Sequence, residues 1–161
     1  MGIDTTFGRA FVKAETAAGT NLPESGLVFL SLADRDKPAG IVVAKRLREL
    51  GLGVAATAGT AKYLENFGVK VDTVVAKLSE VGDGEAPNAI DLIKSGEVSF
   101  VVNTPRGGGS RSDGQAIRMA ANTHRVSSVT TVEAALAAVH GLAEQKDTEV
   151  VVRSLQEYHG R

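Results

Sequence analysis

Cysteine is absent from this 161-residue chain, which excludes disulfide bonds, thiolate metal sites and a cysteine nucleophile. Its absence also fits a reducing compartment. No apolar run approaches the ~20 residues that a helix needs to cross a bilayer. The first residues lack the basic start and apolar centre of a signal peptide. Together these absences predict a soluble protein of the cytoplasm.

An excess of charge of one sign is missing as well. The 18 basic residues nearly balance the 19 acidic ones, so the net charge is −1. No global field attracts nucleic acid or an anionic membrane, and neither is expected as a partner. The lysine-containing P-loop and the dinucleotide-binding fingerprint are also missing.

What is present is an alternation of short apolar runs with longer segments of helical spacing. At this length and 43% hydrophobic residues, the chain is expected to form one main domain. The alternation predicts an α/β fold, a three-layer Rossmann-like domain with a five-stranded, mainly parallel sheet and helices on both faces. The strands are expected at 27–32, 54–56, 69–75, 98–103 and 126–130, and the helices at 37–50, 60–67, 87–96, 114–124 and 131–142.

The two ends of the chain look like additions to this domain. Residues 1–18 have helical spacing, and the segment that follows has the composition of a turn-rich linker. A helix this short should need another surface to pack against. We therefore expect a helix and linker over 1–25 and the main domain over 26–161. Residues 149–158 predict an edge strand that runs into a short helix.

The most informative stretch covers residues 53–61, an apolar run that leads directly into a helical pattern. As strand, turn and helix start, it brings the hydroxyls of Thr57 and Thr60, the backbone of Gly59 and several N–H groups to one helix N-terminus. The partial positive charge there favours an anion. The sequence therefore predicts a phosphate-binding site.

Further polar residues follow the other predicted strands. Parallel strands end at one edge of a sheet, so these residues should surround the same shallow pocket. They are Lys37, Lys77, Asn103, Thr104 and Arg106. Two lysines and an arginine beside hydroxyls suit a phosphomonoester. Taken singly, Lys37 also fits a solvated first-turn residue, Thr60 a helix cap and Lys77 loop surface, but the set favours a ligand.

The remaining candidates favour structural roles. His124 closes a predicted helix, His140 lies within one and His159 is near the end of the chain, so a metal site is not expected. Asp83 and Asp113 are the carboxylates best placed to face the pocket. A turn role for Asp83 and an N-cap role for Asp113 explain both without chemistry.

A series of motifs runs along the whole chain. It comprises 31–37 (SLADRDK), 56–61 (ATAGTA), 76–77 (AK), 101–105 (VVNTP), 113–118 (DGQAIR) and 129–131 (VTT). This series resembles the C-terminal regulatory, methylglyoxal-synthase-like domain of the carbamoyl phosphate synthase large subunit. Residues 5–14 (TTFGRAFVKA) resemble the helix that ends the preceding ATP-grasp half of that family.

The resemblance implies a domain that binds UMP as inhibitor or IMP as activator and has no catalytic residue of its own. It assigns effector contacts to Lys37, Thr57, Thr60, Lys77 and Asn103. Pro105 stands where such relatives often have a threonine; proline cannot donate a hydrogen bond, so Thr104 or Arg106 would replace that contact. The 107–110 insertion also departs from the family pattern. Thr130 matches a position that approaches an ornithine site at the boundary with the catalytic half.

The resemblance also implies a parent enzyme, an ATP-dependent C–N ligase. That enzyme makes carbamoyl phosphate from glutamine, bicarbonate and ATP for pyrimidine and arginine synthesis. ATP and Mg²⁺ belong to its preceding half, and the domain itself is expected to hold no cofactor. The implied partners are the synthetase half, the glutaminase small subunit and, because the whole enzyme can assemble through this domain, a second copy.

Two alternatives share the Thr-x-Gly-Thr signature. Methylglyoxal synthase, acting on dihydroxyacetone phosphate, would add a carboxylate base and a histidine to the same phosphate site. In that family the histidine stands just before the aspartate that opens the helix after the fourth strand, where this chain has Arg111 and Ser112. Asp83 matches the base position only loosely. The cyclohydrolase domain of purine biosynthesis lacks support in the later motifs, so the regulatory interpretation is preferred.

Overall fold

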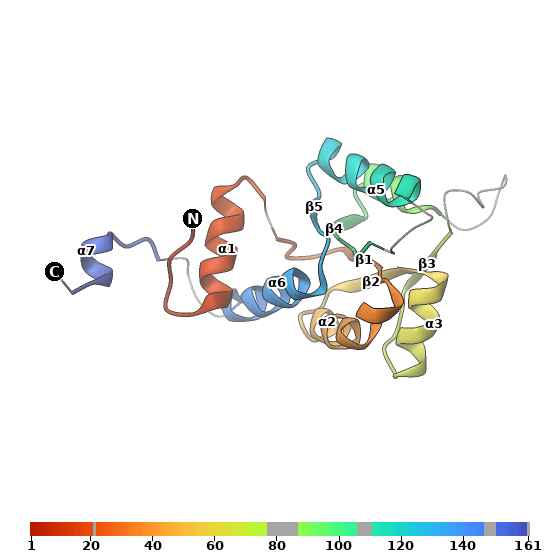
Figure 1. Cartoon of the computed structure of the whole chain (residues 1–161), viewed down its shortest axis with the longest axis horizontal. Coiled ribbons are helices and arrows are strands. Elements are labelled where there is room, and N and C mark those ends of the chain that lie inside the picture. The colour runs from red at the N-terminus through yellow and green to blue at the C-terminus, as the bar shows by residue number, and fades with distance from the viewer. Residues whose placement is uncertain (21, 77–86, 106–110, 147–150, 161) are drawn as a thin grey trace.

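One parallel sheet forms the centre of the protein in a computed structural model that describes residues 1–20, 22–76, 87–105, 111–146 and 151–160 (Figure 1). Its strands are β1 (Leu27–Ser31), β2 (Gly53–Thr57), β3 (Thr73–Val75), β4 (Val98–Asn103) and β5 (Ser127–Val129). They lie in the order β3-β2-β1-β4-β5, and every neighbouring pair is parallel. The predicted α/β fold is confirmed.

Helices cover both faces of this sheet. The helices are α1 (Phe7–Ala17), α2 (Lys37–Glu49), α3 (Ala58–Asn66), α4 (Ala89–Lys94), α5 (Arg111–Thr123), α6 (Val132–Gln145) and α7 (Leu155–Tyr158), and a 3-10 turn spans Asp34–Asp36. Side chains of α2, α3 and α6 share one hydrophobic cluster with the sheet, and those of α4 and α5 share the other. Figure 1 shows α5 on the opposite side of the sheet from α2 and α3.

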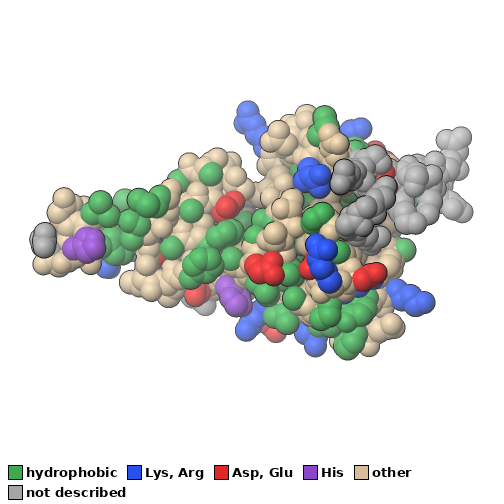
Figure 2. Space-filling model, viewed as in Figure 1, with side chains coloured by type: hydrophobic (Ala, Val, Ile, Leu, Met, Phe, Trp, Pro, Cys, Tyr) green, Lys and Arg blue, Asp and Glu red, His purple; other side chains and the backbone are tan. Residues whose placement is uncertain are grey.

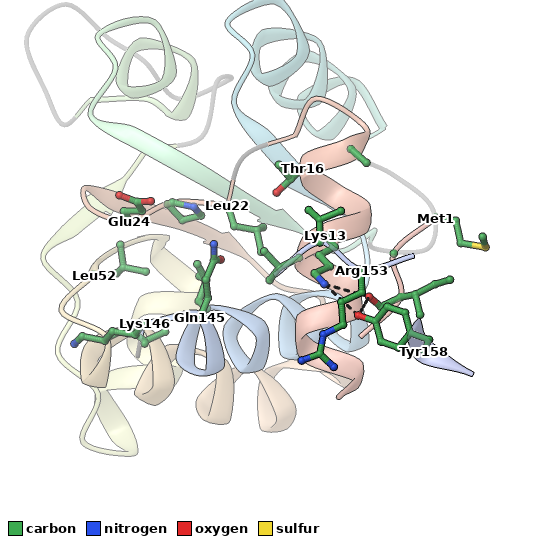
Figure 3. A pocket seen from close by; sticks show the side chains of 18 of the residues that line it. Met1, Lys13, Thr16, Leu22, Glu24, Leu52, Gln145, Lys146, Arg153 and Tyr158 are labelled. Carbon is green, nitrogen blue, oxygen red and sulfur yellow. Dashed lines mark hydrogen bonds between the residues drawn. The ribbon is translucent and has the colours of Figure 1, made fainter. Parts of the chain in front are cut away.

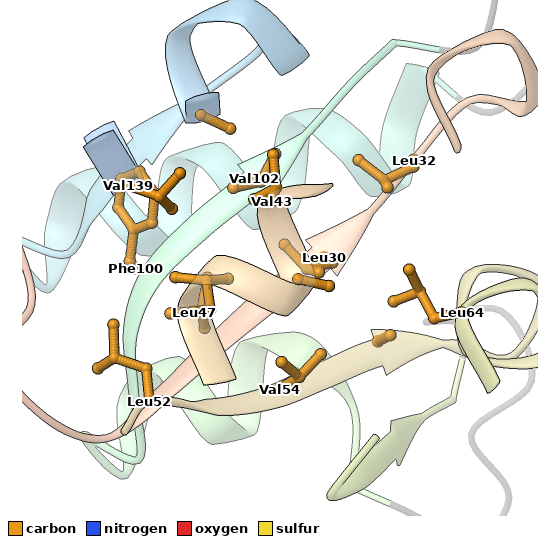
Figure 4. Close-up of a cluster of buried hydrophobic side chains, with 14 of the residues drawn as sticks. Leu30, Leu32, Val43, Leu47, Leu52, Val54, Leu64, Phe100, Val102 and Val139 are labelled. Atoms are coloured by element: carbon orange, nitrogen blue, oxygen red, sulfur yellow. The ribbon is translucent and has the colours of Figure 1, made fainter. Parts of the chain in front are cut away.

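The central strand explains why both faces must be covered. Successive strand side chains point to opposite faces, so Val28 and Leu30 enter the α2/α3/α6 cluster while Phe29 enters the other. All three side chains are fully buried. Figure 4 shows the first cluster, in which Leu30, Val43 and Leu47 lie together. A continuous apolar run is typical of such a strand.

The terminal helix α1 packs against α6, which supplies the surface that a short helix needs. Gly8 and Gly141 let the two backbones approach closely. A Cβ on Gly141 would lie 2.7 Å from the carbonyl oxygen of Gly8 and 2.5 Å from Cγ2 of Val12. Glu144 of α6 accepts a hydrogen bond from the Arg9 N–H at 3.2 Å, so it caps the start of α1.

Several predicted boundaries were wrong. The fourth helix begins at Ala89 because Asn88 caps it, accepting from the Asp91 N–H at 3.0 Å, and Pro87 lies before the cap. Asp113 is not the N-cap of α5 but lies inside its first turn. A carboxylate at this position interacts favourably with the positive end of the helix dipole. The cap predicted at Thr131 is confirmed.

The third strand and the tail also differ from the prediction. Strand β3 covers only Thr73–Val75. Val69 is buried in the core, but its N–H donates to the Leu64 carbonyl at the end of α3 and therefore does not pair with a strand. Residues 151–154 form no strand. The Val151 carbonyl instead accepts a hydrogen bond from Nζ of Lys13 on α1 at 2.5 Å. The short helix of the tail is confirmed as α7, and residues 149 and 150 lie outside the described residues.

Candidate functional site

The predicted phosphate site lies at the carboxyl edge of the sheet, where β2 passes into α3. Lys37, the first residue of α2, extends its side chain to this point. Its Nζ lies 3.9 Å from the place where a Cβ on Gly59 would be, and 5.7 Å from the centre of the Tyr63 ring. The side chain is 13% exposed. The structure therefore brings the ammonium of one helix to the N-terminus of the next.

The two threonines of the signature have different environments. Thr57 is the N-cap residue of α3 and is half-buried, without a side-chain cap bond. Its hydroxyl donates to the Thr60 hydroxyl at 3.1 Å, and Thr60 also accepts from the Leu32 N–H at 3.1 Å. Thr60 is completely buried. Thr60 therefore ties the end of β1 to α3, and is not the helix cap considered from the sequence.

The end of β4 is held next to the end of β1. Ser31 and Asn103 are register partners. The Thr104 hydroxyl accepts from the Ala33 N–H at 2.8 Å, and the Asn103 amide donates to the Gly114 carbonyl at 3.3 Å. Asn103 and Thr104 are both buried. The Thr104 bond fixes the loops after β1 and β4 to each other, and the Asn103 bond ties the end of β4 to the first turns of α5.

Other predicted residues are placed elsewhere or not described. Lys77, Asp83 and Arg106 lie outside the described residues. Thr130 is exposed, between β5 and the cap of α6. The three histidines are all exposed. His124 follows the end of α5, far along the helix from the carboxyl edge where α5 begins.

Three side chains at this edge were missed as candidates by the sequence reasoning. Asp34 pairs with Lys37 at 2.7 Å, and Tyr63 lies beside the same ammonium. A Cβ on Gly114 would lie 3.3 Å from both Nη1 of Arg118 and Nδ2 of Asn103, so the guanidinium reaches back to the edge. Two of these contacts could have been found from sequence spacing. Asp34 precedes Lys37 by three residues and Gly114 precedes Arg118 by four, and residues at such spacings meet in helical segments.

A large cavity lies at the opposite, amino edge of the sheet (Figure 3). It has a volume of about 1390 Å³ and is lined by α1, α6, the segments before β1 and β2, and the tail. Lys13 bonds Asp4 at 2.7 Å and the Tyr158 hydroxyl at 3.4 Å. The hydrogen bond from Lys13, helped by the N–H and hydroxyl of Thr5, lowers the pKa of Asp4 to about 2. None of the predicted effector residues that the structure describes lines this cavity.

Among the residues that the structure describes, no cluster of three or more histidine and acidic side chains is arranged to hold a metal ion. Within the same residues, no helix has the length and apolar character required to span a membrane.

The sheet order and the helix layers define an α/β domain with a parallel five-stranded sheet. The chain belongs to the family of MGS-like domains, whose family model matches residues 40–130. The resemblance derived from the sequence motifs is thus confirmed at the level of this family.

The whole chain is similar to carbamoyl phosphate synthase large chains. It is 44% identical over 160 residues to the "Carbamoyl phosphate synthase large chain, C-terminal section" of Methanopyrus kandleri, covering 99% of this chain and 29% of that protein. It is 42% identical over 160 residues to the large chain of Synechocystis sp. and 46% identical over 160 residues to that of Rubrobacter xylanophilus. These matches cover 99% of this chain but only 14% and 15% of the two relatives.

Proposed function

We propose that this chain is the regulatory domain of a carbamoyl phosphate synthase large chain, and that it binds the phosphate of UMP or IMP at the carboxyl edge. The single observation that carries the proposal is the convergence of the Lys37 ammonium with the N-terminus of α3 at Gly59. The similarity of the whole chain to large chains supports the same assignment.

The physical argument rests on charge and on unpaired helix donors. The first N–H groups of a helix have no partner within it, and its N-terminus carries a partial positive charge. Gly59 is exposed there, and no Cβ blocks the approach of a ligand to the backbone. Lysine adds a full positive charge as a compact donor. The Thr57 hydroxyl stands beside both groups and would supply a further contact.

The remaining contacts are assigned by the same proposal. Asn103 and Thr104 would border the nucleoside, and Lys77 and Arg106 would complete the phosphate contacts. Thr130 would face the synthetase half. The bound nucleotide would shift the packing of the domain against that half by an amount limited by its differential affinity for two states, typically about 1–3 kcal/mol.

Catalysis would belong to the parent enzyme and not to this domain. That enzyme would use glutamine, bicarbonate and ATP with Mg²⁺, together with a glutaminase small subunit, and a second copy of the large chain would be a further partner. The methylglyoxal synthase alternative needs a histidine near the phosphate. Among the described residues, each histidine is exposed away from Lys37: after α5, on α6, or in the tail.

Calorimetric titration of the 161-residue chain with UMP, IMP and the corresponding nucleosides tests the proposal. Lys37→Met should weaken nucleotide binding by at least about tenfold, the order expected for loss of a charged hydrogen bond. Lys45→Met is the matched control, because Lys45 is an exposed lysine of the same helix α2. It should leave the affinity within about twofold.

The nucleosides show whether the phosphate carries the binding. Equal affinity for uridine and UMP, or equal loss in the two lysine variants, would contradict the proposed site. Conversion of added dihydroxyacetone phosphate to methylglyoxal would instead support the enzyme alternative.

A further inference from the structure

An acidic side chain already contacts the ammonium at the centre of the proposed site. Oδ1 of Asp34 lies 2.7 Å from Nζ of Lys37, and the same Nζ lies against Gly59 at the start of α3. We propose that Asp34 is a built-in competitor for the phosphate: its carboxylate neutralises Lys37 in the unliganded protein and lowers the affinity for the ligand. This inference rests on the proposed function.

The charges around Lys37 explain why an anion is needed there. Lys37 is the first residue of α2, so its ammonium lies near the positive end of its own helix as well as that of α3. A cation is disfavoured at a helix N-terminus. The Tyr63 ring offers it a weaker, quadrupolar contact at 5.7 Å. A carboxylate at Asp34 offsets the accumulated positive charge until another anion arrives.

The two partners differ strongly in exposure. The Lys37 side chain is 13% exposed, whereas that of Asp34 is 91% exposed. Lys37 is therefore held by its surroundings, whereas the Asp34 side chain lies almost entirely in water. A phosphomonoester brings nearly twice the charge and three acceptor oxygens. It can thus replace the carboxylate at Lys37, although the displaced negative charge stays nearby and repels it.

This arrangement predicts a gain of binding on removal of a charge. Asp34→Asn keeps the size of the side chain but removes both the competition and the repulsion. The affinity for inorganic phosphate and for UMP should rise about three- to tenfold at low ionic strength, the order that a charge several ångströms away produces near a surface. In about 0.5 M salt the gain should fall below about twofold, because screening is then much stronger.

Asp36 provides a matched control on the same short turn. Its carboxylate pairs with Arg35 at 3.5 Å, and its side chain forms no cap bond to α2. Asp36→Asn and Asp34→Asn each change the net charge from −1 to 0. Titrations with inorganic phosphate, UMP and uridine should show tighter phosphate and UMP binding for Asp34→Asn only, and no change for uridine. Asp34→Ala should reproduce the gain in phosphate affinity, and its thermal unfolding shows that the variant is folded.

The outcomes separate this inference from the proposed site. If the unaltered chain binds UMP and Asp34→Asn binds it equally or more weakly, Asp34 is not a competitor, while the site itself stands. Equal gains in the Asp34 and Asp36 variants would also overturn the inference, since they would reflect net charge alone. If neither the unaltered chain nor any variant binds phosphate or UMP, the proposed site fails and the inference fails with it.

Discussion

The carboxyl and amino edges of the sheet carry different kinds of surface. At the carboxyl edge, hydrogen bonds between hydroxyl and backbone groups, such as that from the Ala33 N–H to the Thr104 hydroxyl at 2.8 Å, hold the loops beside the Lys37 ammonium. The amino edge holds a cavity of about 1390 Å³ and the exposed apolar side chains of Met1, Val152 and Leu155. In Figure 2 the extension that carries the termini shows mostly hydrophobic and uncharged surface, and charged side chains gather over the sheet domain.

The two edges differ in the chemical groups that they offer to a ligand. A phosphate is recognised by donors and positive charge, which need little space, and the carboxyl edge supplies both through α3 and Lys37. The amino-edge cavity is lined by more apolar than charged side chains, and its Lys13 is already engaged by Asp4 and Tyr158.

The largest expected effect is a loss of stability caused by a substitution between α1 and α6, away from the carboxyl edge. Gly141→Val should destabilise the protein by about 3 kcal/mol, because the added carbons overlap Gly8 and Val12 and overpacking costs energy. Urea unfolding measures the loss. The control is His140→Val, an exposed position on the same helix with the same introduced side chain. Unchanged stability of Gly141→Val would contradict the close packing of α1 on α6.

A smaller loss of stability is expected at the carboxyl edge, and it should differ between Thr60 and Thr57. Thr60→Val should cost about 2 kcal/mol, since it removes the buried acceptor of the Leu32 N–H. Thr57→Val should cost less than about 0.5 kcal/mol, as expected for a half-buried position outside the core, but should weaken phosphate binding. Thermal unfolding and phosphate titration of both variants give the comparison. Equal stability losses would show that Thr60 has no special structural role.

The smallest effect concerns acid stability at the amino edge. Hydrogen bonds from Lys13 and, to a smaller extent, from Thr5 lower the pKa of Asp4 from 3.8 to about 2. A lowered pKa in the folded state stabilises that state above pH ~4, and the contribution is lost as the pH falls from about 4 to 2. Asp4→Asn should therefore flatten the fall in stability over this interval. Glu65→Gln, on exposed α3, is the charge control. An unchanged pH profile in Asp4→Asn would contradict the pairing.

The sequence predicted the layers well because the strands are simple apolar runs. Strand 98–103 was predicted with the bounds observed, and β1 differed by one residue. Both strands are central and buried on two faces, which leaves a continuous signal. Edge elements gave a weaker signal: β3 was predicted too long, and the tail strand was wrong over residues 151–154.

The placement of several residues of the candidate site was predicted from the sequence. The strand-turn-helix pattern placed Thr57 and Gly59 at a helix start, and the parallel sheet brought Lys37 and Asn103 to the same edge. Local patterns could not show that Thr60 is used internally, because its partner at Leu32 is distant in the chain. The contact of Lys37 with Tyr63 likewise depends on how α2 packs beside α3.

Nuclear magnetic resonance of backbone amides tests the comparison of the two edges most directly. Titration of the labelled 161-residue chain with UMP should shift the amide signals of Ala58, Gly59 and Thr60 first, because their N–H groups begin α3. Signals of residues lining the amino-edge cavity, such as Leu52 and Tyr158, should change little. Shifts confined to that cavity, with none at the start of α3, would contradict a phosphate site at the carboxyl edge.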